Sequence, residues 1–159
     1  MHHTGDTLTD GSETVYIYDN DKTPSAYSLS DLGNVTEGDT ATFRITRTGG
    51  TNTAGSVRFY TGSGSAASGS DFNSKYETVY FSAGQTTKDI QVKTTDDSRV
   101  EGSESFRGYL QTLKSGDTLT NRFETVYIND NDFYTAKETQ GSVDLVTDST
   151  GGAYVRTAS

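Results

Sequence analysis

Acidic side chains are the residues of this sequence whose types and spacing best suit a chemical role. The chain has no cysteine, and its two histidines are His2 and His3, which resemble part of an N-terminal tag. Carboxylate oxygens without His or Cys are the ligands that Ca²⁺ prefers, whereas Mg²⁺ tends to keep its own waters. The acids of interest follow apolar segments: Glu37, Asp39, Asp71, Asp96, Asp97, Glu101, Asp130 and Asp132.

Seven short segments alternate apolar and polar residues with the period of a half-buried β-strand. They are 26–32, 40–47, 56–61, 76–82, 87–94, 104–112 and 123–129, separated by Gly-rich or Asx-rich breaks. No segment has helical periodicity. We therefore predict an all-β fold, a seven-stranded antiparallel immunoglobulin-like β-sandwich. The predicted inward residues are Phe43, Ile45, Val57, Phe59, Val79, Phe81, Ile90, Val92, Phe106, Leu110, Val126 and Ile128.

An up-and-down run of strands sends alternate loops to opposite ends of the sandwich. All eight acids then fall at one end, whereas the other end holds only Asp117, with Lys114 and Arg122. Close carboxylates repel one another by about 1 kcal/mol per pair in water and about 4 kcal/mol near a protein surface. A compensating cation is therefore expected. A solvated acidic rim that aids solubility is the open alternative.

Composition excludes several partners. The net charge is −9 and the pI is about 4.5, which disfavours nucleic acid and anionic membrane surfaces. No apolar run approaches the length of a membrane span. Without cysteine there is no disulfide framework, and a metal can stabilise a small module in its place.

An internal duplication sets the predicted boundaries. Residues 5–21 (GDTLTDGSETVYIYDND) and 116–132 (GDTLTNRFETVYINDND) match at 13 of 17 positions. The spacing indicates tandem modules of domain size. We expect 1–21 to hold the last strand of a preceding repeat, 22–132 a complete domain, and 133–159 a linker or the start of the next module. Within 133–159, the stretch 143–155 reads either as a hairpin or as a linker. Residues 12–18 could replace 123–129, which allows a strand-exchanged homodimer.

Short motifs along 26–132 resemble the Calx-β domain family, known from sodium–calcium exchanger regulatory domains and bacterial adhesins. They are Val35-Thr36-Glu37-Gly38, Gly69-Ser70-Asp71-Phe72, 81–86 (FSAGQT), Asp96-Asp97 before 100–106 (VEGSESF), and Asp130-Asn131-Asp132. The resemblance implies an immunoglobulin-like sandwich with Ca²⁺ at its acidic end. It assigns family calcium ligands to Glu37, Asp71, Asp96 and Asp97.

The full predicted metal set adds three acids near those four. Asp130 and Asp132 lie where the chain leaves the site, and Glu101 is included although a structural role is equally open. Glu104 is expected to be structural, paired with a nearby Arg or Lys. Family acids are replaced by Ser63, Lys75 and Ser98, so we expect one or two Ca²⁺ ions.

The leading functional hypothesis is a calcium-binding structural module of a secreted or cell-surface bacterial protein with many repeats, in which Ca²⁺ stiffens the joints between neighbouring repeats. The alternative is an adhesive recognition module that binds a glycan or protein through exposed aromatics. Calcium sensing is a further possibility. Enzymatic activity is not expected, because no nucleophile motif is present. The outward aromatics are Tyr16, Tyr18, Tyr60, Tyr80 and Tyr127.

Overall fold

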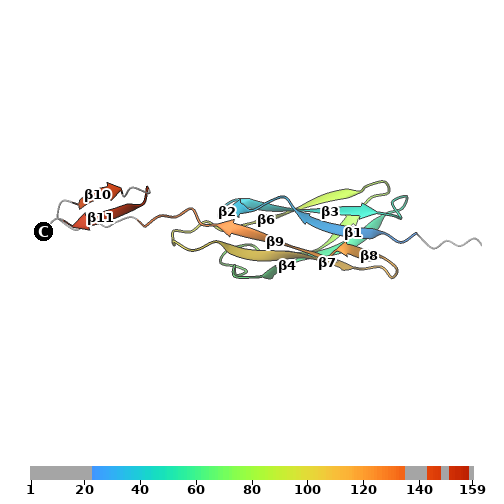
Figure 1. Ribbon diagram of the computed structural model, residues 1–159. Coiled ribbons are helices and arrows are strands. Elements are labelled where there is room, and N and C mark those ends of the chain that lie inside the picture. Colours follow the sequence, from blue (N-terminus) through green and yellow to red (C-terminus); the bar gives the residue numbers. More distant parts are fainter. Residues whose placement is uncertain (1–22, 135–142, 148–150, 158–159) are drawn as a thin grey trace, which may run out of the picture.

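The computed structural model describes residues 23–134, 143–147 and 151–157, and all regular elements in these ranges are strands. In Figure 1 most of the strands form two layers facing each other. The strands are β1 (Ala26–Asp31), β2 (Val35–Thr36), β3 (Thr40–Thr48), β4 (Gly55–Ser63), β5 (Tyr76–Phe81), β6 (Thr87–Lys93), β7 (Glu104–Thr112), β8 (Thr118–Asn121), β9 (Phe123–Asn129), β10 (Val143–Thr147) and β11 (Ala153–Thr157).

One layer is a four-stranded sheet in the order β6-β3-β1-β8, and the other is a five-stranded sheet in the order β2-β9-β7-β4-β5. The strands β10 and β11 pair antiparallel with each other, with Val143 opposite Thr157. The tail therefore contains the hairpin that its sequence allowed. Among the described parts of the chain, no helix has the length and apolarity to cross a membrane.

The prediction of seven strands, all antiparallel, was partly wrong. Its seven segments correspond to β1, β3, β4, β5, β6, β7 and β9, but β2 and β8 bring the two sheets to nine strands. Both additions pair in parallel, β2 with β9 and β8 with β1, so the sheets are mixed. Two and four residues are too short to show a period of two, and this explains why the sequence pattern missed them.

The core lies between the two sheets and contains every predicted inward residue. Two core residues, Ala66 and Phe72, come from the β4–β5 loop instead of a strand, and both are fully buried. The ring of Phe72 stacks on Phe106, with centroids 4.4 Å apart. Full burial of such a side chain contributes about 1.5–3 kcal/mol. The loop that carries Asp71 is thus anchored in the core.

Aromatic residues form a row across the outer face of the five-stranded sheet. Tyr76, Tyr60, Tyr109 and Phe123 lie directly opposite one another on β5, β4, β7 and β9. Tyr60 and Tyr109 stack at 5.1 Å with their planes 11° apart, and the other neighbours lie at 6.1 and 6.3 Å. Such cross-strand aromatic pairs stabilise a sheet.

The loops alternate between two poles as predicted. The acidic pole brings together the β2–β3, β4–β5 and β6–β7 loops with the chain after β9. The opposite pole gathers the residues before β1, the β3–β4 loop and the β7–β8 loop.

Candidate metal centre

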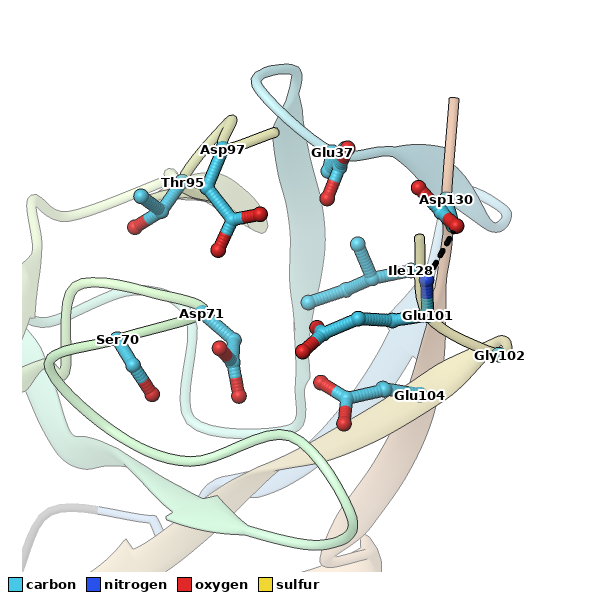
Figure 2. A pocket seen from close by; sticks show the side chains of 10 residues that line it. All are labelled: Glu37, Ser70, Asp71, Thr95, Asp97, Glu101, Gly102, Glu104, Ile128 and Asp130. Atoms are coloured by element: carbon cyan, nitrogen blue, oxygen red, sulfur yellow. Dashed lines mark hydrogen bonds between the residues drawn. The ribbon is translucent and has the colours of Figure 1, made fainter. Parts of the chain in front are cut away.

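Carboxylates from four segments surround a small cavity at the acidic pole. Figure 2 shows their side chains converging from the loops and from the start of β7. The cavity volume is about 10 Å³, room for a single water-sized sphere. Its lining is Glu37, Ser70, Asp71, Thr95, Asp97, Glu101, Gly102, Glu104, Ile128 and Asp130.

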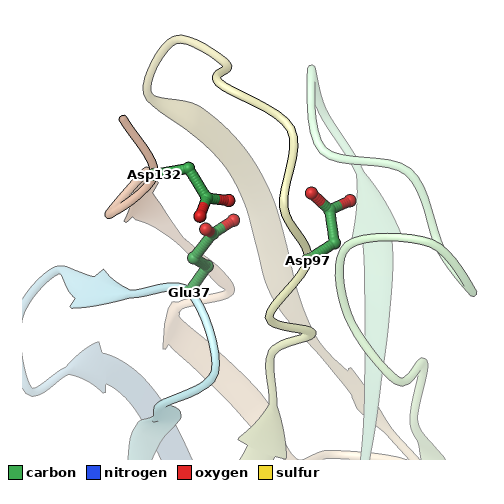
Figure 3. A group of neighbouring side chains, drawn as sticks. All are labelled: Glu37, Asp97 and Asp132. Atoms are coloured by element: carbon green, nitrogen blue, oxygen red, sulfur yellow. The ribbon is translucent and has the colours of Figure 1, made fainter. Parts of the chain in front are cut away.

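A first cluster consists of Glu37, Asp97 and Asp132, each with a carboxylate oxygen within 4.8 Å of the others (Figure 3). Two of these oxygens, Oε1 of Glu37 and Oδ2 of Asp132, are buried and have no hydrogen-bond donor among the described residues. Buried carboxylate oxygens without a donor are costly. A proton or a cation between them removes that cost.

Local backbone geometry places Glu37 beside the β6–β7 loop. Its N–H donates to the carbonyl of Asn129 at 2.9 Å, which continues the β2–β9 pairing. The next residue, Gly38, has φ +80°, and a Cβ there would lie 2.9 Å from the Cβ of Asp96. A side chain at this position would push the two loops apart. Glycine is therefore required for Glu37 to approach Asp97.

A second cluster consists of Asp71, Glu101 and Glu104, again with carboxylate oxygens within 4.8 Å of one another. In Figure 2 these three carboxylates point toward a common centre. Arg99 makes an ion pair with Glu101 at 3.5 Å, but its side chain is 78% exposed, so water screens this pair. The second cluster therefore retains most of its negative charge.

The β4–β5 loop fixes the position of Asp71. The N–H of Ala67 donates to Oδ2 of Asp71 at 2.6 Å. The backbone N–H of Asp71 donates to the Ala67 carbonyl, and its own carbonyl accepts from the N–H of Thr95. Because Phe72 is a core residue, the adjacent Asp71 is held at the rim of the sandwich with little freedom.

Asp130 lies between the two clusters and is held by backbone donors. Its Oδ2 accepts from the N–H of Glu101 at 2.6 Å, and its Oδ1 accepts from the N–H of Asp132 at 2.8 Å. These hydrogen bonds hold the pKa of Asp130 below its usual range. Asp130 stays ionised and links the end of β9 to the β6–β7 loop.

Each cluster contains one glutamate with a raised pKa. Burial, assisted by the charges of Asp130 and Asp132, raises the pKa of Glu37 to about 7 against a hydrogen bond from Asn131. In the second cluster, burial and the neighbouring Asp71 carboxylate raise the pKa of Glu104. Without a cation, Glu37 is therefore partly protonated near neutral pH, and Glu104 ionises less readily than an ordinary glutamate.

Asp71 titrates in the opposite direction. Burial opposes its ionisation, but hydrogen bonds from Ala67, Ser70 and Glu104 outweigh burial and lower the pKa of Asp71. In the second cluster, ionisation is thus favoured at Asp71 and disfavoured at Glu104.

The structure brings six of the seven predicted metal ligands to the two clusters and the cavity between them. Asp96 is the exception: its Oδ1 accepts from the side-chain amide of Asn131 at 3.2 Å, and it does not line the cavity. The sequence also predicted that Glu104 is structural and forms an ion pair with a nearby Arg or Lys. In the described residues no Lys or Arg lies within 4 Å of it, and it joins Asp71 instead. Its place at the start of β7, directly after the acidic loop, was the available signal.

Two of the residues that stand in place of family acids interact with neighbours outside the two clusters. The Oγ of Ser63 accepts from the N–H of Ser68 at 3.2 Å. Lys75 forms an ion pair with Glu77 at 3.7 Å.

The residues present fit a hard divalent cation. All of the side-chain atoms that could bind a metal are oxygens, and two of them are buried without a hydrogen-bond donor. The two clusters offer separate centres. Glu37, Asp97 and Asp132 would hold one ion, and Asp71, Glu101 and Glu104 a second, with Asp130 between them. Oxygen-only donor sets of this kind suit Ca²⁺.

The fold and the site define a β-sandwich with a carboxylate-lined pole. The Calx-beta domain model matches residues 19–132. The chain belongs to the Calx-beta domain family.

Solved structures show the same fold. The apo-form Calx CBD1 domain superimposes with a TM-score of 0.60 at 24% identity, covering 67% of this chain and 98% of that one. The calcium binding domain CBD12 of CALX1.1 gives 0.60 at 24% identity, covering 68% of this chain but only 44% of that one. The Calx CBD2 domain gives 0.53 at 13% identity, covering 65% and 86%. A search of curated protein sequences found no match.

Proposed function

We propose that this domain binds Ca²⁺ at its acidic pole, where two carboxylate clusters supply ligands for up to two ions. The observation that carries the proposal is the convergence of two three-carboxylate clusters, one of which has two buried oxygens without a donor. A solvated acidic rim would leave such oxygens in water. The likeness to a calcium binding domain supports the same conclusion.

Thermal unfolding tests this proposal, because a ligand selective for the folded state raises stability. We expect a higher midpoint in excess Ca²⁺ than in chelator, and a smaller difference in a Glu37→Gln variant. Asp39→Asn is the matched control, since Asp39 is exposed and lies outside both clusters at the same pole. Equal midpoints in Ca²⁺ and chelator for the unmodified protein would refute the proposal.

We further propose that calcium stiffens the joint between consecutive modules. The chain enters β1 at the acid-poor pole and leaves β9 at the acidic pole, so modules joined end to end place each cation site beside the next module. Asp130 and Asp132 belong both to the site and to the exit segment. A secreted or cell-surface protein with many repeats is the setting in which millimolar calcium fills weak sites.

Scattering from a two-module protein tests this mechanical role. Ca²⁺ should narrow the distribution of inter-module distances relative to chelator, and Asp132→Asn should reduce that effect. A distribution that is the same in both conditions, in a protein that still binds Ca²⁺, would limit the function to local binding or sensing.

Recognition through exposed aromatics is the weaker candidate. Tyr80 and Tyr127 are 68% and 48% exposed, which favours it. However, the aromatic row of Tyr76, Tyr60, Tyr109 and Phe123 has its rings in contact with one another, and Arg58 lies over Tyr76 at 4.8 Å. The stacked faces of Tyr60 and Tyr109 are not available to a sugar, whereas Tyr76 and Phe123 are 69% and 43% exposed. Mutual stabilisation explains the row without a ligand.

A further inference from the structure

A second and larger cavity lies at the acid-poor pole, away from the carboxylate clusters. Its volume is about 250 Å³, and it opens between the residues that precede β1, the β3–β4 loop and the β7–β8 loop. The residues that matter to its chemistry are Ser25, Arg47, Gly55, Ser56, Lys114 and Asp117.

Arg47 gives this cavity a buried positive charge. It is 1% exposed and is among the largest fully buried side chains of the described residues. Its Nε donates to the Ser25 hydroxyl at 3.0 Å, and its Nη2 donates to the carbonyls of Gly50 and Thr53 at 2.7 and 2.8 Å. All three acceptors are neutral. Its Nη1 is buried and has no acceptor in the described parts of the chain.

Neutral partners do not compensate a buried guanidinium. Arginine stays charged at all ordinary pH values, so it cannot remove the cost by losing a proton. Among the described residues no carboxylate makes an ion pair with Arg47. The one acid in the lining, Asp117, uses its Oδ1 to accept from the N–H of Ser25 at 2.8 Å.

Gly55 leaves room at the guanidinium. A Cβ at this position would lie 2.7 Å from Cζ and Nη2 of Arg47 and 2.6 Å from the hydroxyl of Tyr27. That hydroxyl is also buried without a partner among the described residues. The Tyr27 hydroxyl and the Arg47 guanidinium therefore pack against the one residue of the lining that has no side chain.

We propose that this cavity binds a carboxylate group through Arg47. A carboxylate is planar and matches the guanidinium edge. A doubly charged phosphate fits less well, because Asp117 lies in the same cavity and repels the second charge. The group is supplied either by a small organic acid or by an Asp or Glu side chain of another protein copy. The site lies at the pole opposite the proposed calcium centre, so it operates without Ca²⁺.

Nitrogen NMR of arginine side chains in calcium-free buffer, with the chelator removed because it is itself a carboxylate, tests the proposal directly. Sodium acetate should shift the Arg47 Nε signal saturably, whereas acetamide, its neutral counterpart, should leave the signal unchanged. A carboxylate from a second copy would instead shift that signal as protein concentration rises in acetate-free buffer. Either result supports a carboxylate site. Equal responses to acetate and acetamide, or no response to acetate or concentration, would overturn it.

A charge-supplying variant provides a second test without removing Arg47. Thr53 lines the cavity and its carbonyl accepts from Nη2 of Arg47, so Thr53→Glu introduces a carboxylate beside the guanidinium, and Thr53→Gln is its uncharged control. The Glu variant should unfold at a higher temperature than the Gln variant and should no longer respond to acetate. A Glu variant that is no more stable than the Gln variant would contradict the proposal.

Discussion

The side chains of the acidic pole carry opposite pKa shifts. Glu37 and Glu104 have raised pKa values, whereas Asp71 and Asp130 have lowered ones. Glu37 thus holds a proton part of the time near neutral pH where a proposed cation would lie, and Glu104 ionises less readily than an ordinary glutamate. Metal binding and proton release are therefore linked in this account.

The raised pKa of Glu37 predicts how the calcium-free protein responds to pH. Glu37 titrates at about 7 in the folded state and at its ordinary 4.5 when unfolded. The folded state binds more protons across that window, so the free energy of unfolding contributed by this group falls as pH rises from 4.5 to about 7. Urea unfolding in chelator should show a smaller fall for Glu37→Gln than for the unmodified protein.

The lowered pKa values of Asp71 and Asp130 do not change the stability between pH 4.5 and about 7. They change it only near and below 3.8, the ordinary pKa of an aspartate. If the unfolding free energy of Glu37→Gln fell with pH as steeply as that of the unmodified protein, Glu37 would be ionised in the calcium-free site.

Two neighbouring acids should differ in their effect on calcium affinity. Glu104 lies in the second cluster, whereas Asp96 is hydrogen-bonded to Asn131 outside both clusters. We expect Glu104→Gln to weaken Ca²⁺ binding by roughly ten- to a hundredfold, and Asp96→Asn to weaken it much less. Calorimetric titration measures both. The reverse order would restore Asp96 as a ligand and Glu104 as a structural residue.

At the scale of elements, the β4–β5 loop depends on one buried ring. Phe72→Ala removes the stack on Phe106 and should cost about 3–5 kcal/mol of stability. Because Asp71 is the preceding residue, the calcium affinity of the folded fraction should fall too. Phe81→Ala is the control: Phe81 is equally buried but contacts Tyr27 on another part of the core. Equal calcium affinities in the two variants would show that Phe72 does not position Asp71.

The strands and the acidic pole could be predicted from the sequence, but the division into clusters could not. The alternation of apolar and polar residues identifies long strands such as β3 and β7. The up-and-down order of the strands then assigns each loop to one end of the sandwich. The order of the strands does not predict the direction of a side chain within a loop. It therefore could not distinguish Asp96, which accepts a hydrogen bond from Asn131, from Asp97, which clusters with Glu37. The parallel pairings of β2 and β8 depend on contacts between distant residues, which no local pattern records.

At the scale of the whole molecule, the duplicated segment predicts exchange between copies. Residues 13–21 repeat the residues that β9 contributes to the core and to the acidic pole, with Val15 and Ile17 in the places of Val126 and Ile128. The segment lies outside the described residues. We expect light scattering to give a mass that rises with protein concentration, and a Val15→Asp variant to stay monomeric. A concentration-independent monomer would exclude exchange.

Calorimetric titration of Ca²⁺ into the metal-free protein is the decisive test of calcium binding at the acidic pole. The two clusters predict saturable binding of one or two ions per chain, with affinity in the range of weak extracellular modules, about 10⁻⁴–10⁻³ M. Asp39→Asn should bind like the unmodified protein, whereas Glu37→Gln should bind more weakly. No saturable heat up to about 10 mM Ca²⁺, well above that range, would contradict the assignment of the acidic pole as a calcium site.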